Sequence, residues 1–133
     1  MLCKIPFVTI VAASLASASC DFAKRSDYPN PDSKWAVTLS NTVDCGGSHR
    51  LWVEDLLGKC GACKWLKGTP YFGNVKSFAY NELTGSRTQH LQFYSDHNCK
   101  HAIKPGGTFT YAKIANSTSK EVRGAQSFMV CEK

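Results

Sequence analysis

The segment KCGACKWLKG, residues 59–68, carries two cysteines three positions apart, and the bonding of these cysteines decides how the chain folds. Cys60-Gly-Ala-Cys63 has the spacing of a thiol–disulfide oxidoreductase, in which a helix N-terminus stabilises the reactive thiolate. The same residues can instead be two half-cystines that join parts of a small secreted domain. The remainder of the chain distinguishes these two hypotheses.

The N-terminus predicts secretion. Lys4 precedes an apolar run, and Ala16-Ser17-Ala18 fits the small-residue pattern of a signal peptidase site. The run is about 10 to 12 residues long, shorter than the ~20 that a membrane-spanning helix needs. We therefore expect residues 1–18 to be a cleaved signal peptide. Residues 19–133 then form a single secreted, cysteine-rich domain without an integral membrane segment.

Six of the seven cysteines remain when Cys3 leaves with the signal peptide. An even number in an oxidising compartment predicts disulfides throughout, although the sequence leaves their pairing open. The dibasic pair Lys24-Arg25 is a potential processing site, and cleavage there would remove Cys20. We expect the pair to remain as two solvated basic residues. The predicted half-cystines are Cys20, Cys45, Cys60, Cys63, Cys99 and Cys131.

The chain is basic, with 16 Lys and Arg residues against 10 Asp and Glu residues and a formal net charge of +6. Loss of Lys4 leaves 15 basic residues and a net charge of +5. A basic surface favours anionic partners. The expected partner is a host protein or an anionic surface or glycan, and nucleic acid is expected only if the protein is an enzyme.

Most of the chain predicts antiparallel strands. In SKWAVTLSN, residues 33–41, apolar and polar side chains alternate, which indicates a half-buried strand. Two segments rich in aromatic residues, 74–83 and 87–96, flank Thr84-Gly85-Ser86 and predict a β-hairpin. Further strands are expected over residues 108–116 and 125–132.

One helix is predicted, over residues 46–59. Ser48 suits the N-cap and Gly58 suits a left-handed stop. The apolar stripe of this helix consists of Leu51, Trp52 and Leu56. The predicted class is α+β: a small disulfide-stapled domain with one short helix and a mainly antiparallel sheet of four to five strands.

The surroundings of Cys60 and Cys63 favour a structural role. In a thioredoxin fold the two cysteines follow a buried strand and open a long helix. Gly68-Thr-Pro70 ends any helix soon after Cys63, so we expect both cysteines to bond to distant partners. A zinc site that adds residues from DHNCKH, 96–101, is the alternative, but thiols oxidise outside the cell. No metal or cofactor is expected.

A secreted ribonuclease is the main enzymatic hypothesis. Phosphodiester transfer on RNA needs a base, an acid and a cation that stabilises the developing phosphate charge. Glu82, Arg87 and His90 lie close together along the predicted hairpin and are the candidate catalytic residues. The simpler interpretation is an exposed polar hairpin end, so a protein without catalytic activity is favoured.

Lysines and aromatic residues alternate in KCGACKWLKGTPYFG, residues 59–73. Such groups together bind sugar rings or bases by stacking and charge. The predicted binding residues are Lys64, Trp65, Lys67 and Tyr71. Asn116-Ser-Thr118 is an N-glycosylation sequon and predicts a glycan on Asn116.

Two further segments carry a resemblance. HLQFYSDHNCKH, residues 90–101, is an apolar strand that ends in a Tyr-x-Asp-x-x-Cys turn, and GAQSFMVC, residues 124–131, contains Ser-Phe-x-Val. With the signal peptide and six cysteines, the chain resembles small secreted cysteine-rich fungal proteins, many of which are virulence effectors. The two segments are also similar to a degenerate βγ-crystallin Greek key, in which Tyr94 packs at the corner and Ser127 ties the turn.

The resemblance to effectors implies a monomeric, extracellular binding protein that acts on a host or extracellular target without catalysis. The calcium-ligand pattern of the βγ-crystallins is absent from the two segments, so calcium is not implied. A secreted ribonuclease-like protein and an antimicrobial toxin are the alternatives.

Overall fold

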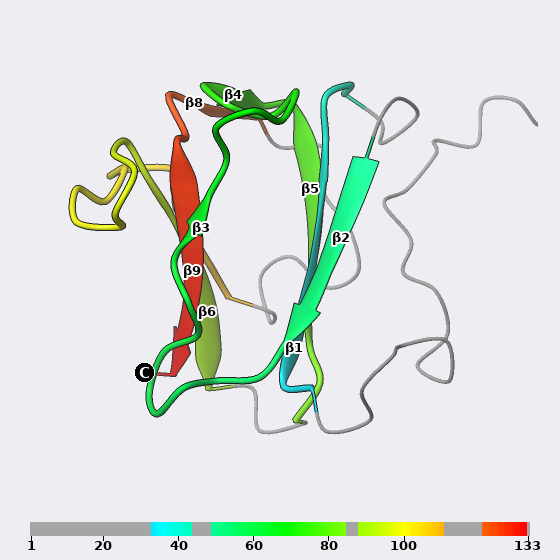
Figure 1. The fold of residues 1–133 in the computed structure, drawn as a ribbon, viewed down its shortest axis with the longest axis vertical. Helices are drawn as coiled ribbons and strands as arrows, with labels where there is room; N and C mark the ends of the chain where they lie inside the picture. The colour runs from blue at the N-terminus through cyan, green and yellow to red at the C-terminus, as the bar shows by residue number, and fades with distance from the viewer. Residues whose placement is uncertain (1–32, 44–48, 85–87, 111–120, 133) are drawn as a thin grey trace, which may run out of the picture.

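The computed structural model of the protein describes residues 33–43, 49–84, 88–110 and 121–132. The predicted signal peptide and several predicted residues lie outside these ranges, namely Cys20, Lys24, Arg25, Cys45, Arg87 and Asn116. Within the described ranges the chain forms β-strands and no helix (Figure 1). The strands are β1 Trp35–Ser40, β2 His49–Glu54, β3 Lys64–Trp65, β4 Asn74–Val75, β5 Ser77–Glu82, β6 Gln89–Tyr94, β7 Thr108–Thr110, β8 Val122–Arg123 and β9 Ser127–Glu132.

The strands form two main sheets that face each other as the layers of a sandwich (Figure 1). The first sheet has the order β2-β1-β5 and the second the order β3-β9-β6-β7. The short pair β4-β8 lies at the upper end in this view. All the strand pairs are antiparallel. The chain crosses from the first sheet to the second after β2. It returns to the first sheet at β5 and crosses to the second sheet again before β6.

The predicted α+β class is wrong, because the described part of the chain is mainly β. Most of the expected helix, residues 46–59, is β2 and the turn that follows it. Leu51 is 39% exposed and Trp52 is 9% exposed, so neighbouring side chains lie on opposite faces, as in a strand. Gly58 has a φ of 88°, but it lies in a turn closed by the Leu57 N–H bonding to the Cys60 carbonyl at 2.8 Å.

The predicted hairpin is also absent from the described strands, since β5 and β6 lie in different sheets. β5 pairs with β1, and β6 pairs with β7 and β9. Packed sheets are about 10 Å apart, and an extended residue spans roughly 3.3 Å. The residues between Glu82 and Gln89 are therefore enough to cross between layers, and a tight turn is not required.

Two other strands are confirmed, although one is more buried than expected. β9 occupies most of residues 125–132 as predicted. β1 lies within residues 33–41, but all six of its residues are buried, because it is the central strand of its sheet. β7 begins at Thr108 as expected, and the end of that predicted strand lies outside the described residues.

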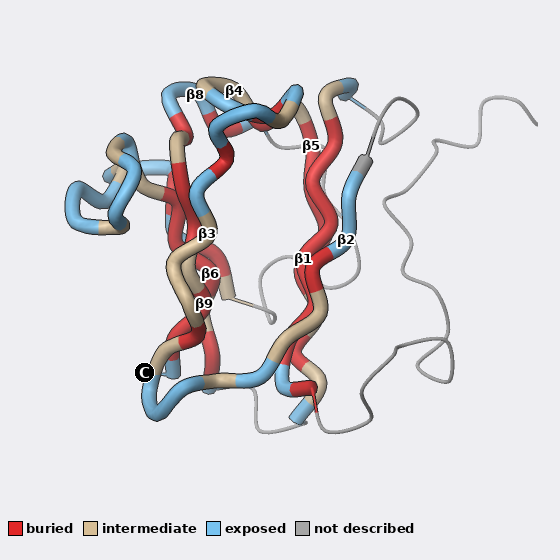
Figure 2. Tube along the Cα trace, viewed as in Figure 1, coloured by how far each residue is buried: buried red, intermediate tan, exposed pale blue. Residues whose placement is uncertain are grey.

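The strands of both sheets consist largely of buried residues (Figure 2), and the largest buried side chains are aromatic. Trp52 and Phe128 come from opposite sheets, and their rings meet edge to face with centroids 5.2 Å apart. Phe78 and Phe109 are 4.6 Å apart. Burial of each such side chain stabilises the fold by about 1.5–3 kcal/mol, and edge-to-face contacts add about 0.5–1.5 kcal/mol. The sandwich thus provides a rigid support for side chains on its outer faces.

Candidate binding surface

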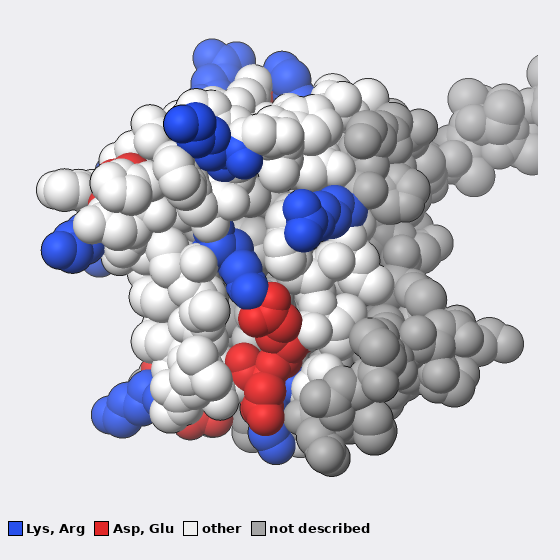
Figure 3. All heavy atoms as spheres, in the orientation of Figure 1, with Lys and Arg blue, Asp and Glu red and all other residues white. Residues whose placement is uncertain are grey.

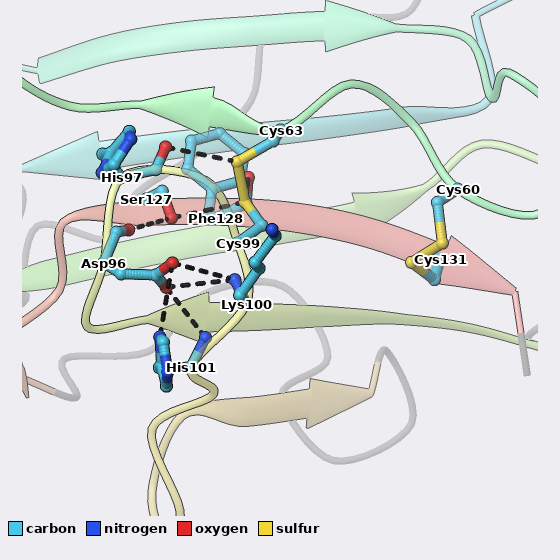
Figure 4. The surroundings of a disulfide bond; sticks show 10 residues. All are labelled: Cys60, Cys63, Asp96, His97, Cys99, Lys100, His101, Ser127, Phe128 and Cys131. Atoms are coloured by element: carbon cyan, nitrogen blue, oxygen red, sulfur yellow. Dashed lines mark hydrogen bonds and ion pairs between the residues drawn. A yellow bond between two sulfur atoms is a disulfide. The ribbon is translucent and has the colours of Figure 1, made fainter.

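The segment from Cys60 to Cys63 leads the chain into the second sheet, and each cysteine bonds to a different partner (Figure 4). Cys60 bonds to Cys131 in β9, and Cys63 bonds to Cys99 in the turn after β6. The prediction of distant partners is therefore confirmed for both cysteines. Because their sulfurs are bonded, they provide neither a redox pair with each other nor thiolate ligands for zinc.

Gly61 explains why the crossing segment packs so closely on the core. A Cβ atom at this position would lie 2.9 Å from Nε1 of Trp35, a distance that real Cβ contacts do not allow. That indole nitrogen donates a hydrogen bond to the Asp55 carbonyl at 3.2 Å. The Gly61 N–H donates to the Val130 carbonyl at 2.8 Å, so the segment is fixed to both sheets.

Trp65 lies on the outer face of the second sheet. In an antiparallel pair, residues directly opposite each other share a face. Lys64 is opposite Phe128, a core residue, whereas Trp65 is opposite Ser127 on the other face. Trp65 is 50% exposed. Its ring centroid lies 5.5 Å from that of His97 and 5.3 Å from the Nζ of Lys67. We call Trp65, Lys67 and His97 the Trp65 surface.

The turn over residues 95–101 holds His97 in place, and Asp96 organises this turn (Figure 4). The Asp96 carboxylate accepts hydrogen bonds from the backbone N–H groups of Lys100 at 3.0 Å and His101 at 2.8 Å. Desolvation acts to raise the pKa of Asp96, but these bonds and the neighbouring His101 side chain outweigh it and hold that pKa below its ordinary value. The ionised carboxylate therefore stabilises the turn.

The same turn is attached to the sheet at two points. The Ser127 hydroxyl donates a hydrogen bond to the Asp96 carbonyl at 2.6 Å, which links the turn to β9. Cys99 is bonded to Cys63 and has a φ of 58°, a left-handed conformation that residues other than glycine rarely adopt. These attachments present His97 beside Trp65 as part of a preorganised surface.

The predicted binding residues do not all lie on this surface. Trp65 and Lys67 contact each other there, as described. Lys64 projects from the opposite face of β3 and forms an ion pair with Glu54 of β2. Tyr71 is 2% exposed and packs against Trp52 with ring centroids 6.2 Å apart, so it belongs to the core.

One residue of the Trp65 surface was not predicted as a binding residue from the sequence, and neither was one cation–π contact outside this surface. His97 is brought to Trp65 by the pairing of Cys63 with Cys99, which the sequence left open. The guanidinium of Arg50 lies 4.8 Å from the ring centroid of Trp52, at the first sheet. Only the two-residue period of a strand, which places Arg50 and Trp52 on the same face, could have indicated this second contact.

The candidate catalytic residues are not brought together among the described residues. Glu82 is 7% exposed, and its carboxylate accepts hydrogen bonds from the Thr84 hydroxyl at 2.6 Å and the Gln89 N–H at 3.3 Å. His90 is opposite Cys131, on the outer face of the second sheet. Glu82 is thus engaged inside the sandwich while His90 faces away from the core.

The neighbouring Tyr80 is similarly enclosed. Its hydroxyl donates a hydrogen bond to the Gln89 side chain at 3.2 Å. Burial, and then the charge of Glu82, raise the pKa of Tyr80 well above its ordinary value, so its hydroxyl stays protonated. This end of the sandwich therefore has the character of a buried polar network that holds strands together.

Over the described residues there is no enclosed pocket and no group of three or more metal-ligating side chains. None of the described segments forms a helix that is long and apolar enough to cross a membrane. On the face seen in Figure 3, several basic groups surround one acidic patch.

Comparison of the chain with protein-family models, with curated proteins and with solved structures finds no match. The resemblance to fungal effectors and to βγ-crystallins therefore stays a prediction. The two disulfides fit an extracellular protein, because such bonds form and persist in oxidising compartments.

Proposed function

We propose that the protein is a secreted, effector-type binding protein that engages a host or extracellular target without catalysis. Its N-terminal signal pattern and its disulfides support the extracellular location. The observation that carries the proposal is the Trp65 surface: a half-exposed tryptophan contacts a lysine and a histidine on a support fixed by a disulfide. Tryptophan is among the residues that most often dominate binding energy at interfaces.

Preorganisation strengthens this proposal. Ordering a side chain or a loop on binding costs free energy, roughly 0.5–1.5 kcal/mol for each immobilised long side chain. Trp65 is flanked by His97, and the turn carrying His97 is fixed by Ser127 and by the Cys63–Cys99 bond. Much of the ordering cost is therefore met in the free protein.

Of the two alternatives, the ribonuclease has no support in the geometry of Glu82 and His90. The antimicrobial toxin rests on the basic charge of the chain alone. A growth-inhibition assay at low salt, where charge attraction is least screened, distinguishes the toxin from a binding protein.

The proposal is tested with the labelled, secreted protein applied to intact extracellular matrix or cell-wall material of candidate hosts. We expect the wild type to be retained and Trp65→Ala to lose at least about tenfold in affinity, as interface tryptophans do. Leu57→Ala is the matched control, because Leu57 is exposed and lies in the turn before Cys60.

Equal retention of the wild type and Trp65→Ala contradicts the proposal. So does degradation of added RNA that disappears in Glu82→Gln or His90→Ala. Both assays use the same preparation, and the circular dichroism spectrum of each variant, compared with that of the wild type, reveals any folding defect.

A further inference from the structure

We propose that the Trp65 surface binds an acidic polysaccharide, and specifically a chain of uronic acids, together with the basic turn that follows β6. This inference rests on the proposed function and names the ligand class of the same surface. The basic turn consists of His97, Lys100, His101 and Lys104, all of which are exposed.

The first argument is the charge of the turn. Asp96 is the only acidic residue between positions 88 and 110. Its carboxylate is already occupied by the backbone N–H groups of Lys100 and His101 and by the ring of His101, 3.5 Å away. Among the described residues neither Lys100 nor Lys104 forms an ion pair, and both are exposed, so an anionic ligand can neutralise their charges.

The second argument is the position of the turn. The Cys63–Cys99 bond joins it to the residue before β3, and His97 lies against Trp65. Figure 4 shows that His97 and Lys100 belong to the same turn, one on each side of Cys99, and it is His97 of this turn that lies against Trp65. A ligand that covers Trp65 therefore also approaches the charges of the turn.

The third argument is the combination of ring and cation. The flat face of an indole packs on the C–H groups of a sugar ring by apolar contact. The Nζ of Lys67 lies over the Trp65 ring, 5.3 Å from its centre, so it is placed to pair with a carboxylate of a sugar that packs on the exposed part of the ring. A uronic acid presents both groups in one residue, and a chain repeats them toward the turn.

The open shape of the surface favours a polymer over a small molecule. Small ligands are held in clefts that bury most of their surface, and no enclosed pocket occurs over the described residues. A membrane-binding surface needs a broad apolar face. Here Trp65 stands among charged and polar side chains, so the surface matches a hydrated, charged chain better than a bilayer.

The experiment measures binding of the full secreted protein to defined probes by quenching of tryptophan fluorescence with iodide. The chain has three tryptophans. Trp35 is fully buried and Trp52 nearly so, and therefore iodide reports mainly on Trp65. The probes are polygalacturonate, its fully methyl-esterified form, a single-stranded RNA and vesicles with phosphatidylserine.

We expect polygalacturonate to protect Trp65 from iodide and to bind at least about tenfold more tightly than the methyl-esterified chain, because only the former carries charge. Changing both Lys100 and Lys104 to Gln should weaken binding by about three- to tenfold and flatten its dependence on salt. Lys34→Gln is the control, since Lys34 is an exposed cation next to β1 of the first sheet, away from the Trp65 surface, and its loss should leave binding unchanged.

Equal affinity for the charged and esterified chains overturns the inference, as does protection of Trp65 by RNA or vesicles alone. These outcomes leave the proposed function standing if Trp65→Ala still loses retention on extracellular material. Loss of that retention difference as well refutes both proposals. Affinity is compared only among variants whose Trp35 and Trp52 emission matches that of the wild type, which confirms the fold.

Discussion

The second sheet has two faces that differ in chemistry, although the same strands form both. Its inner face carries Phe93, Phe128 and Val130, all fully buried against the first sheet. Its outer face carries Trp65 and Ser127, one half-exposed and the other bonded to the turn over residues 95–101. The comparison teaches that alternation along a strand lets one sheet hold the fold together and also present a binding surface.

The largest effect is expected from a substitution that removes a side chain from the inner face. Phe128 packs edge to face on both Trp35 and Trp52. Phe128→Ala should lower the free energy of unfolding by about 3–5 kcal/mol, because it removes a large buried ring and leaves a cavity. Urea denaturation followed by tryptophan fluorescence measures the change. A loss no larger than that of Leu57→Ala would show that the aromatic core is not the source of stability.

The second effect is expected from removing the disulfide that attaches the turn over residues 95–101 to the second sheet. Changing both Cys63 and Cys99 to Ala opens the connection across a sequence separation of 36 residues. Stability should fall by about 2–4 kcal/mol, the range for native disulfides. The iodide quenching constant of Trp65 should then rise, because His97 is no longer held beside the ring and more of it is exposed. Unchanged quenching would mean that Ser127 alone positions the turn.

The third effect concerns the segment from Cys60 to Cys63, which leads the chain from the first sheet to the second. Gly61→Ala places a methyl group 2.9 Å from the Trp35 indole nitrogen, so the segment or the ring must shift. We expect a loss of about 1–3 kcal/mol, typical of overpacking, and a red shift of Trp35 emission. Ala62→Gly, which adds no atoms, is the control. Wild-type stability in Gly61→Ala would contradict the close packing.

The smallest effect concerns pH and sharpens the description of the outer face. Because the folded-state pKa of Asp96 is lowered, its ionised form stabilises the protein above the unfolded-state pKa of about 3.9. This contribution is lost as the pH falls through the folded-state value. The stability difference between wild type and Asp96→Asn should therefore be greatest near neutral pH and vanish in acid. A difference that is constant with pH would exclude a role for the charge.

The sequence predicted the parts of the fold whose pattern has one interpretation. The alternation of Trp35, Val37 and Leu39 with polar residues identified β1, and the apolar run identified β9. Residues 46–59 fit both the helical period and the strand period, since Leu51, Trp52 and Leu56 also make a helical stripe. Pairing with β1 makes residues 49–54 a strand. Pairing with distant strands also places β5 and β6 in different sheets. The turn residues between them carry no information about these distant partners.

The same limit applies to the binding surface. Trp65 and Lys67 were predicted because they are neighbours in the sequence, and they do contact each other. Tyr71 matched the same composition but lies in the core, where the direction of its side chain depends on the tertiary fold. His97 reaches Trp65 only through a disulfide whose pairing the sequence does not specify.

The positions of the two disulfides among the described residues also determine the product of proteolysis within the interval that they span. The Cys60–Cys131 bond spans a sequence separation of 71 residues, and the Cys63–Cys99 bond lies inside that interval. Any single peptide-bond cut between residues 60 and 131 therefore leaves two pieces that are still covalently joined. An extracellular protease that nicks an exposed loop would yield a two-chain protein of unchanged mass apart from one added water, which separates only after reduction.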